Sequence, residues 1–100
     1  MSFTRNGPLV VWGPDSGTRL VDADDATMTF EPTTGRLTAS GPGFEIAGNI
    51  QRSPSGFDRS DSPTFLSCKL DDGTYTQWTL YQMTDSERAE VLAAYRQWMS

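Results

Sequence analysis

The sequence contains no histidine and only one cysteine, Cys68. Imidazole activates serine and cysteine nucleophiles, transfers protons near neutral pH and is a common zinc ligand. Its absence therefore excludes Ser-His and Cys-His catalysis, together with zinc sites that contain histidine. A single thiol completes neither a structural zinc site nor a disulfide bond within the chain.

Positive charge and long apolar runs are also scarce. Eight basic residues, of which Lys69 is the single lysine, stand against 13 acidic ones, and the net charge is −5. Binding to nucleic acid or to anionic membranes needs a positive surface, so this balance argues against both kinds of partner. No apolar run approaches the roughly 20 residues of a membrane span, and residues 9–12 form too short a run for a signal peptide. We therefore expect a cytoplasmic protein.

The composition predicts one folded domain that spans residues 1–100. Hydrophobic residues make up 36% of the chain and aromatic residues 11%, a content typical of globular proteins and too high for a disordered chain. The 9 glycines and 6 prolines separate short apolar runs, a spacing typical of β-rich folds. The polar residues 1–7 are expected to be frayed.

The segment Pro63–Met99 carries the clearest structural signals. Two alternating runs flank Asp71-Asp72-Gly73, which predicts a β-hairpin because Asp and Gly accept the positive φ angles of such turns. A two-residue loop would mix apolar and polar side chains on both faces, whereas a three-residue loop with Gly73 in the left-handed region separates them. The inward face then carries Leu66, Cys68, Leu70, Thr76, Trp78 and Leu80. The outward face carries Ser67, Lys69, Tyr75, Gln77 and Thr79.

A C-terminal helix is predicted after this hairpin. Thr84 and Glu87 have the spacing of a capping box, in which each side chain accepts a hydrogen bond from a backbone N–H of the other residue. About fifteen helical residues, roughly 22 Å long, would follow. Their apolar residues recur at helical spacing and are expected to pack on the sheet: Val91, Leu92, Tyr95, Trp98 and Met99.

Short strands are predicted over the first half of the chain. We expect strands at 8–13, 19–21, 27–31, 36–40 and 44–50, with Gly48 as a bulge or close-contact point. Residues 22–25 are expected to end the second strand. Residues 51–62 then form a long loop without periodicity, and loops of that length are often functional or disordered.

Together, these predicted elements indicate an α+β fold, mostly β, with six or seven short antiparallel strands and one C-terminal amphipathic helix. The strands would form a bent sheet or a partly open barrel. This order of elements resembles the pleckstrin-homology-like superfold, which implies a seven-stranded bent sheet closed by the helix. The basic phosphate-binding loop of its lipid-binding members has no counterpart here. A small open barrel or a two-layer α+β fold also fits the pattern.

Three aspartates form the candidate metal site: Asp22, Asp24 and Asp25. Closely spaced carboxylates suit Ca²⁺ or Mg²⁺, but Thr27 and Thr33 replace the glycine and glutamate of the helix-loop-helix calcium pattern. The alternative is a solvated acidic turn that discourages pairing between sheet edges. A third interpretation is that these acids, together with Asp15 and Glu31, imitate nucleic-acid phosphates, as would suit an inhibitor of a nucleic-acid-binding enzyme.

Partner binding is predicted at the 51–62 loop and on the outward face of the last hairpin. Exposed aromatic and arginine side chains anchor protein interfaces, because they bury large areas and form oriented hydrogen bonds. The candidate residues are Arg52, Phe57, Arg59, Tyr75 and Tyr81. Phe57 could instead fold back over an edge of the core.

These features favour a non-enzymatic protein-binding domain without a cofactor. Its small size and acidity suit an inhibitor, an immunity protein or a phage counter-defence protein that masks its partner, in bacteria or their phages. One alternative is a small-ligand carrier, in which the bent sheet and the helix enclose a pocket lined by aromatic residues such as Trp12, Trp78 and Trp98. Another is an enzyme that uses carboxylates or a metal. Cys68 is expected to be buried as a small apolar group.

Overall fold

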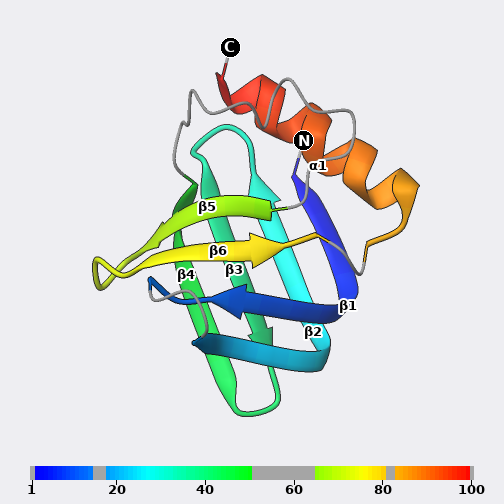
Figure 1. Ribbon diagram of the computed structural model, residues 1–100. Helices are drawn as coiled ribbons and strands as arrows, with labels where there is room; N and C mark the ends of the chain where they lie inside the picture. The colour runs from blue at the N-terminus through cyan, green and yellow to red at the C-terminus, as the bar shows by residue number, and fades with distance from the viewer. Residues whose placement is uncertain (1, 15–17, 51–64, 81–82, 100) are drawn as a thin grey trace.

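A computed structural model describes residues 2–14, 18–50, 65–80 and 83–99. Within these ranges the chain forms six strands followed by one helix (Figure 1). They are β1 (Phe3–Trp12), β2 (Arg19–Glu31), β3 (Arg36–Gly41), β4 (Phe44–Ile50), β5 (Phe65–Leu70), β6 (Tyr75–Thr79) and α1 (Asp85–Met99). The predicted fold class, mostly β with a C-terminal helix, is confirmed.

The strands form a closed antiparallel barrel in the order β1-β2-β3-β4-β5-β6. Closure comes from β1, which pairs with β2 and also with β6 through Val11 opposite Trp78 and Trp12 opposite Gln77. The predicted order of strands and helix therefore holds. The described residues form six strands that close completely, in place of a seven-stranded bent sheet or a partly open barrel.

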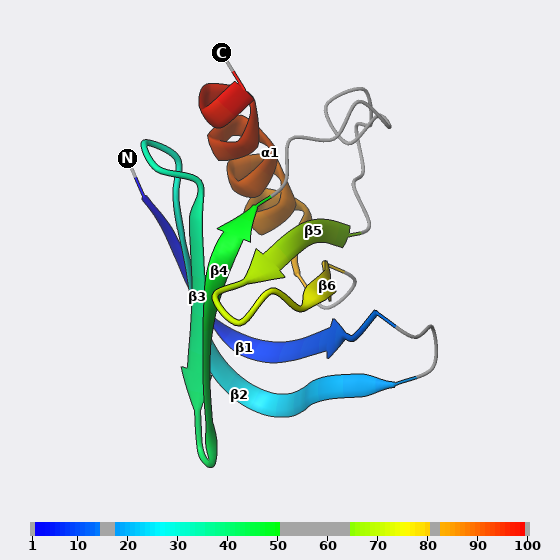
Figure 2. The ribbon, with the colours of Figure 1, turned by 90° about the vertical axis from the view of Figure 1, so that its left-hand side faces the viewer.

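The strands β1 and β2 are longer than predicted and curve strongly (Figure 2). Residues 3–7 are not frayed: Phe3 pairs with Phe30, and both side chains are buried. The register shifts between Gly7 and Leu9, so that Pro8 lies opposite two residues of β2, Asp24 and Asp25. Pro8 has no N–H to donate, and a bulge at this point lets both strands bend. The acidic segment 22–25 therefore continues the strand that it was predicted to end.

The hairpin of β5 and β6 has the predicted register. The Leu70 N–H donates to the Thr74 carbonyl oxygen at 2.8 Å, which closes a three-residue loop, and Gly73 has φ +93°. Leu66 lies opposite Trp78, with both side chains inside the barrel. One outward residue differs from the prediction, because Thr79 is buried and donates its hydroxyl to the Val10 carbonyl oxygen at 3.0 Å.

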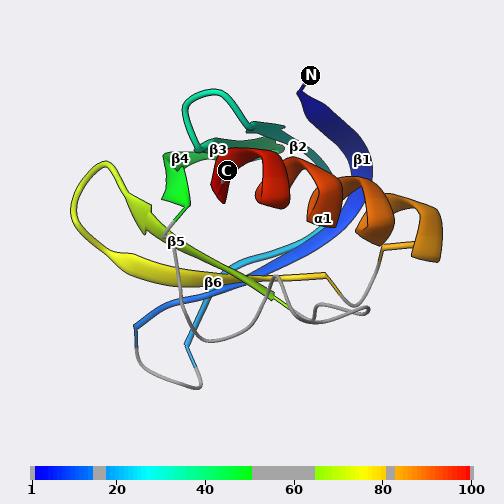
Figure 3. The same ribbon diagram turned by 90° about the horizontal axis from the view of Figure 1, so that it is seen from above.

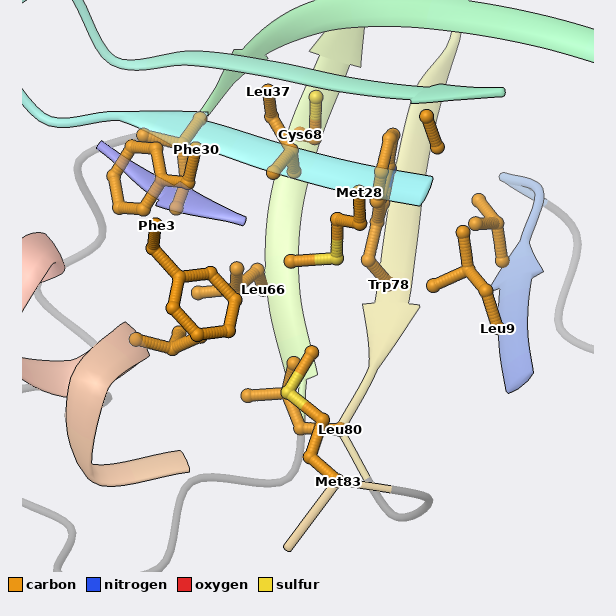
Figure 4. Close-up of a cluster of buried hydrophobic side chains, with 14 of the residues drawn as sticks. Phe3, Leu9, Met28, Phe30, Leu37, Leu66, Cys68, Trp78, Leu80 and Met83 are labelled. Carbon is orange, nitrogen blue, oxygen red and sulfur yellow. The ribbon is translucent and has the colours of Figure 1, made fainter. Parts of the chain in front are cut away.

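Large apolar side chains fill the barrel interior (Figure 4). The residues labelled there come from β1, β2, β3, β5 and β6 and from the segment before α1. Polar groups inside have partners: the indole N–H of Trp78 donates to Thr76 Oγ1 at 2.9 Å, and that hydroxyl donates to the Cys68 carbonyl oxygen at 2.8 Å. The core therefore buries its few polar atoms without leaving these donors unsatisfied.

A close contact explains Gly48 of β4, which lies opposite Leu70. A Cβ atom at this position would lie 2.4 Å from the Lys69 carbonyl oxygen and 2.7 Å from the Leu70 Cα. The predicted close-contact role is confirmed, since only glycine lets β4 and β5 approach this far.

The helix α1 lies across one end of the barrel, against β1 and β2 (Figure 3). Its capping box is present: the Thr84 N–H donates to Glu87 Oε1 at 2.8 Å, and the Glu87 N–H donates to Thr84 Oγ1 at 3.1 Å. The predicted apolar face is buried through Val91, Leu92 and Tyr95. Trp98 lies partly buried beside Gly35, in the turn between β2 and β3. The side chain of Met99 lies outside the described residues.

A buried arginine ties the start of α1 to β1. The Arg5 side chain is only 5% exposed, and its Nε lies 3.2 Å from Oε2 of Glu87. Its Nη1 donates to the Pro8 carbonyl oxygen at 2.6 Å. Glu87 thus caps the helix and neutralises Arg5 at once. The hydrogen bond from the Thr84 N–H has the largest effect in holding the pKa of Glu87 below its usual value, and the hydrogen bond and positive charge of Arg5 add to it.

Candidate partner-binding surface

One row of side chains crosses the outside of the barrel from β2 to β5. Trp12 lies opposite Arg19 on one side and Gln77 on the other, and Gln77 lies opposite Ser67. Their neighbours along the strands, such as Val11, Leu66 and Trp78, point into the core. Because successive side chains of a strand alternate between faces, the packing of the core fixes this row on the outside.

Aromatic side chains are concentrated around this row. Tyr75 is 56% exposed and Phe65 is 41% exposed, and Trp12 is partly buried. We define the aromatic outer face as the outward side chains of β1, β5 and β6 that surround the row: Trp12, Phe65, Ser67, Lys69, Tyr75 and Gln77. Large exposed aromatic side chains on rigid strands are suited to burying area against another molecule, because few rotamers are lost on contact.

A hollow of about 580 Å³ opens on this face. Its walls come from the end of β1 and from the β5–β6 hairpin. The lining residues are Trp12, Gly13, Pro14, Ser67, Tyr75, Thr76 and Gln77. The indole and phenol rings offer apolar area, while the Ser67 hydroxyl and the Gln77 amide can donate and accept hydrogen bonds. The hollow can therefore hold an apolar group that carries polar atoms at its edge.

Two cations lie on the aromatic rings of the face. The Arg19 guanidinium carbon is 5.0 Å from the Trp12 ring centroid, and the Lys69 Nζ is 5.4 Å from the Tyr75 ring centroid. Arg19 also donates to Oδ2 of Asp22 at 2.6 Å. Cation–π contacts at exposed sites are worth about 0.5–1 kcal/mol. They favour the ring orientations that form the walls of the hollow.

An ion pair anchors the β5–β6 hairpin to β3. Both terminal nitrogens of Arg36 donate to the two carboxylate oxygens of Asp71, each at 2.6 Å. This bidentate geometry holds the pKa of Asp71 below its usual value and that of Arg36 above it. The tip of the hairpin is thereby tied to the neighbouring wall of the barrel.

The structure places only one of the five predicted partner-binding residues on this face. Tyr75 is exposed as expected. Arg52, Phe57 and Arg59, together with Tyr81, lie outside the described residues, as does the predicted loop 51–62. The sequence did not identify Trp12 and Phe65 as part of the surface. Trp12 comes near Tyr75 only because β1 closes on β6, and no local pattern reports that pairing.

The three aspartates of the candidate metal site lie elsewhere, exposed along β2. Asp22, Asp24 and Asp25 line a groove of about 350 Å³ together with Leu20 and the turn of the β3–β4 hairpin. Across the described ranges, no three His, Cys, Asp or Glu side chains form a group that could hold a metal ion. Asp22 is instead paired with Arg19.

The other predicted chemical groups are also separated. Cys68 is fully buried, and this burial raises the pKa of its thiol to about 12, so the thiol is protonated at neutral pH. Trp78 fills the core, Trp98 packs beside Gly35 and Trp12 lies on the outer face. The three tryptophans therefore do not line one common pocket, because β-strand alternation sends Trp12 and Trp78 to opposite sides of the wall.

In the part of the chain that the structure describes, no helix is long and apolar enough to cross a membrane. Comparisons with models of protein families, with curated proteins and with solved structures find no significant match to this chain.

Proposed function

We propose that this chain is a non-enzymatic protein-binding domain and that the aromatic outer face is its contact surface. One observation carries the proposal: Trp12 and Tyr75 both line a hollow of about 580 Å³ on the outside of a closed barrel. Interface anchors are typically aromatic side chains held beside a pocket, because they bury much area at a small entropic cost. The barrel supplies the rigid support that such a site needs.

The proposal includes a mode of action. A compact chain of 100 residues with a net charge of −5 can mask a partner's surface, as an inhibitor, an immunity protein or a phage counter-defence protein would. A cytoplasmic location belongs to the same proposal. Residues 51–62, which precede β5 in the chain, are proposed to extend the surface.

A small-ligand carrier is the second candidate, and the volume of the hollow favours it. Pockets for small molecules measure roughly 300–1,000 Å³, and this hollow lies within that range. A ligand that binds only the folded state raises the melting temperature by mass action. A thermal-shift screen with metabolites therefore separates the two candidates, since a protein-binding face gives no shift with small molecules alone.

Affinity capture with matched variants tests the proposal. Tagged protein would be used to capture partners from extracts of the cells that make it, and the bound proteins quantified by mass spectrometry. We expect Tyr75→Ser combined with Phe65→Ser to lose the partner, while Glu45→Ser, on the outside of β4, retains it. Circular dichroism melting curves must show that all variants are folded.

Equal capture by the double variant and the wild type would contradict the proposed surface. Phe57→Ala and Arg59→Ala test residues 51–62 in the same assay. We expect each to weaken capture, and unchanged capture by both would remove this segment from the surface.

A further inference from the structure

We infer that the segment bound by the aromatic outer face is acidic, with a large apolar side chain beside one or more carboxylates. The inference rests on the proposed protein-binding function and names the chemistry of the partner. It comes from the charges around the hollow, which differ from those of the chain as a whole.

None of the described residues that line the hollow carries a carboxylate, and the cations of Arg19 and Lys69 lie over the rings of Trp12 and Tyr75 in its walls. Three other arginines are already neutralised: Arg5 by Glu87, Arg36 by Asp71 and Arg88 by Asp85. Arg19 forms an ion pair with Asp22 in addition to its contact with the Trp12 ring. Lys69 differs, because no carboxylate of the described residues lies within ion-pair distance of its amine. Its three donors are therefore available at the rim beside Tyr75.

The overall negative charge does not oppose this assignment at close range. Charges separated by more than about 8 Å are largely screened at physiological ionic strength. A carboxylate placed against Lys69 experiences the amine far more strongly than it experiences distant acids. The exposed aspartates of β2 line a separate groove, beside Leu20 and the β3–β4 turn. An acidic partner segment would be repelled there, so the charge pattern also selects between the two surfaces.

The lining suggests how such a segment would sit. Its apolar side chain would enter the hollow and contact the Trp12 and Tyr75 rings, and the Ser67 hydroxyl and Gln77 amide would hydrogen-bond its backbone or polar atoms. A neighbouring carboxylate would then pair with the Lys69 amine. Ion pairs at the rim of an interface contribute mainly to specificity and association rate, so the acidic flank should decide which segments bind.

Three synthetic nine-residue peptides test the inference. Each has Leu-Trp-Leu at its centre, and the flanking residues are all Glu, all Gln or all Lys. Nuclear magnetic resonance titration of isotope-labelled protein would follow the amide signals of Ser67, Tyr75 and Gln77. We expect the Glu peptide to bind about tenfold more tightly than the Lys peptide, with the Gln peptide between them. Raising the salt concentration should reduce the difference.

Two charge-reversal variants provide the control. Lys69→Glu is expected to reverse the order of the Glu and Lys peptides. Arg96→Glu, which makes the same change of net charge on α1, is expected to preserve it. If the Lys peptide binds the wild type as tightly as the Glu peptide, or if no peptide shifts these signals, the inference is wrong. The protein-binding proposal is judged separately, by the capture experiment with Tyr75→Ser and Phe65→Ser.

Discussion

The two faces of the β5–β6 hairpin share one backbone but differ in how far their side chains are exposed. Inward side chains such as Cys68 and Trp78 have no exposed surface, whereas outward Tyr75 is 56% exposed. Alternation along the strand therefore assigns stability to one face and leaves the other available for contact with a partner. Substitutions on the inward face should therefore change stability, and substitutions on the outward face should change binding.

The largest difference is expected in thiol reactivity. Wild-type protein has only the buried Cys68 thiol, whose pKa is about 12. A Ser67→Cys variant with Cys68→Ala carries its thiol on the outer face, where we expect an ordinary pKa of about 8.5. At pH 8 the outer thiol should react with Ellman's reagent at least about a thousand times faster than Cys68 of the wild type. The reaction needs a deprotonated thiol that the reagent can reach, and the buried Cys68 meets neither condition. Similar rates in folded protein would contradict the separation of the faces.

The next largest effect is on stability. Trp78→Ala should lower the free energy of unfolding by about 3–5 kcal/mol, because it leaves a cavity in the barrel and removes a satisfied indole. Urea denaturation measures the change. The matched control is Gln77→Ala on the outer face, which should change stability by less than about 0.5 kcal/mol. Equal losses for the two variants would show that the faces are not independent.

A smaller effect is expected at Glu87, where α1 meets the buried Arg5. Glu87→Gln should cost about 1–3 kcal/mol, because Arg5 loses the charge that compensates its burial. The pKa of Glu87 is lowered by folding, so the carboxylate's stabilisation is present above its unfolded pKa and is lost as the pH falls through the folded value. When urea denaturation is measured from pH 7 to pH 3, the free energy of unfolding should therefore fall less steeply for Glu87→Gln than for the wild type. Parallel curves would contradict this role.

The smallest effect on stability is expected at Tyr75. Tyr75→Ser removes a mostly exposed ring and its contact with Lys69, so the melting temperature should change by no more than about 2 °C. Scanning calorimetry measures this shift. A drop of many degrees would mean that Tyr75 supports the fold, and loss of binding by this variant could then not be assigned to the outer face.

Local signals predicted much of the fold. Asp71-Asp72-Gly73 set the hairpin register, and Thr84 with Glu87 marked the start of α1, because each depends on residues near it in the chain. Non-local features were not predictable in the same way. The bulge opposite Pro8 shifts the alternation in β2, so its two halves resembled separate strands with an acidic end between them.

The candidate surface was less predictable than the fold. Tyr75 could be placed outside by alternation within one hairpin. The position of Trp12 beside it depends on β1 pairing with β6, which are almost at opposite ends of the sequence. The burial of Arg5 likewise requires α1 to bring Glu87 against β1. These contacts follow from closure of the whole barrel, which no short pattern encodes.

Photo-crosslinking from two positions tests the proposed surface most directly. A photoreactive phenylalanine would replace Tyr75 on the aromatic outer face or Glu45 on the outside of β4, in cells that make the protein. We predict one crosslinked protein of defined mass from position 75, abolished by Trp12→Ser, and none from position 45. Crosslinks of equal yield from both positions, or none from position 75, would contradict the account.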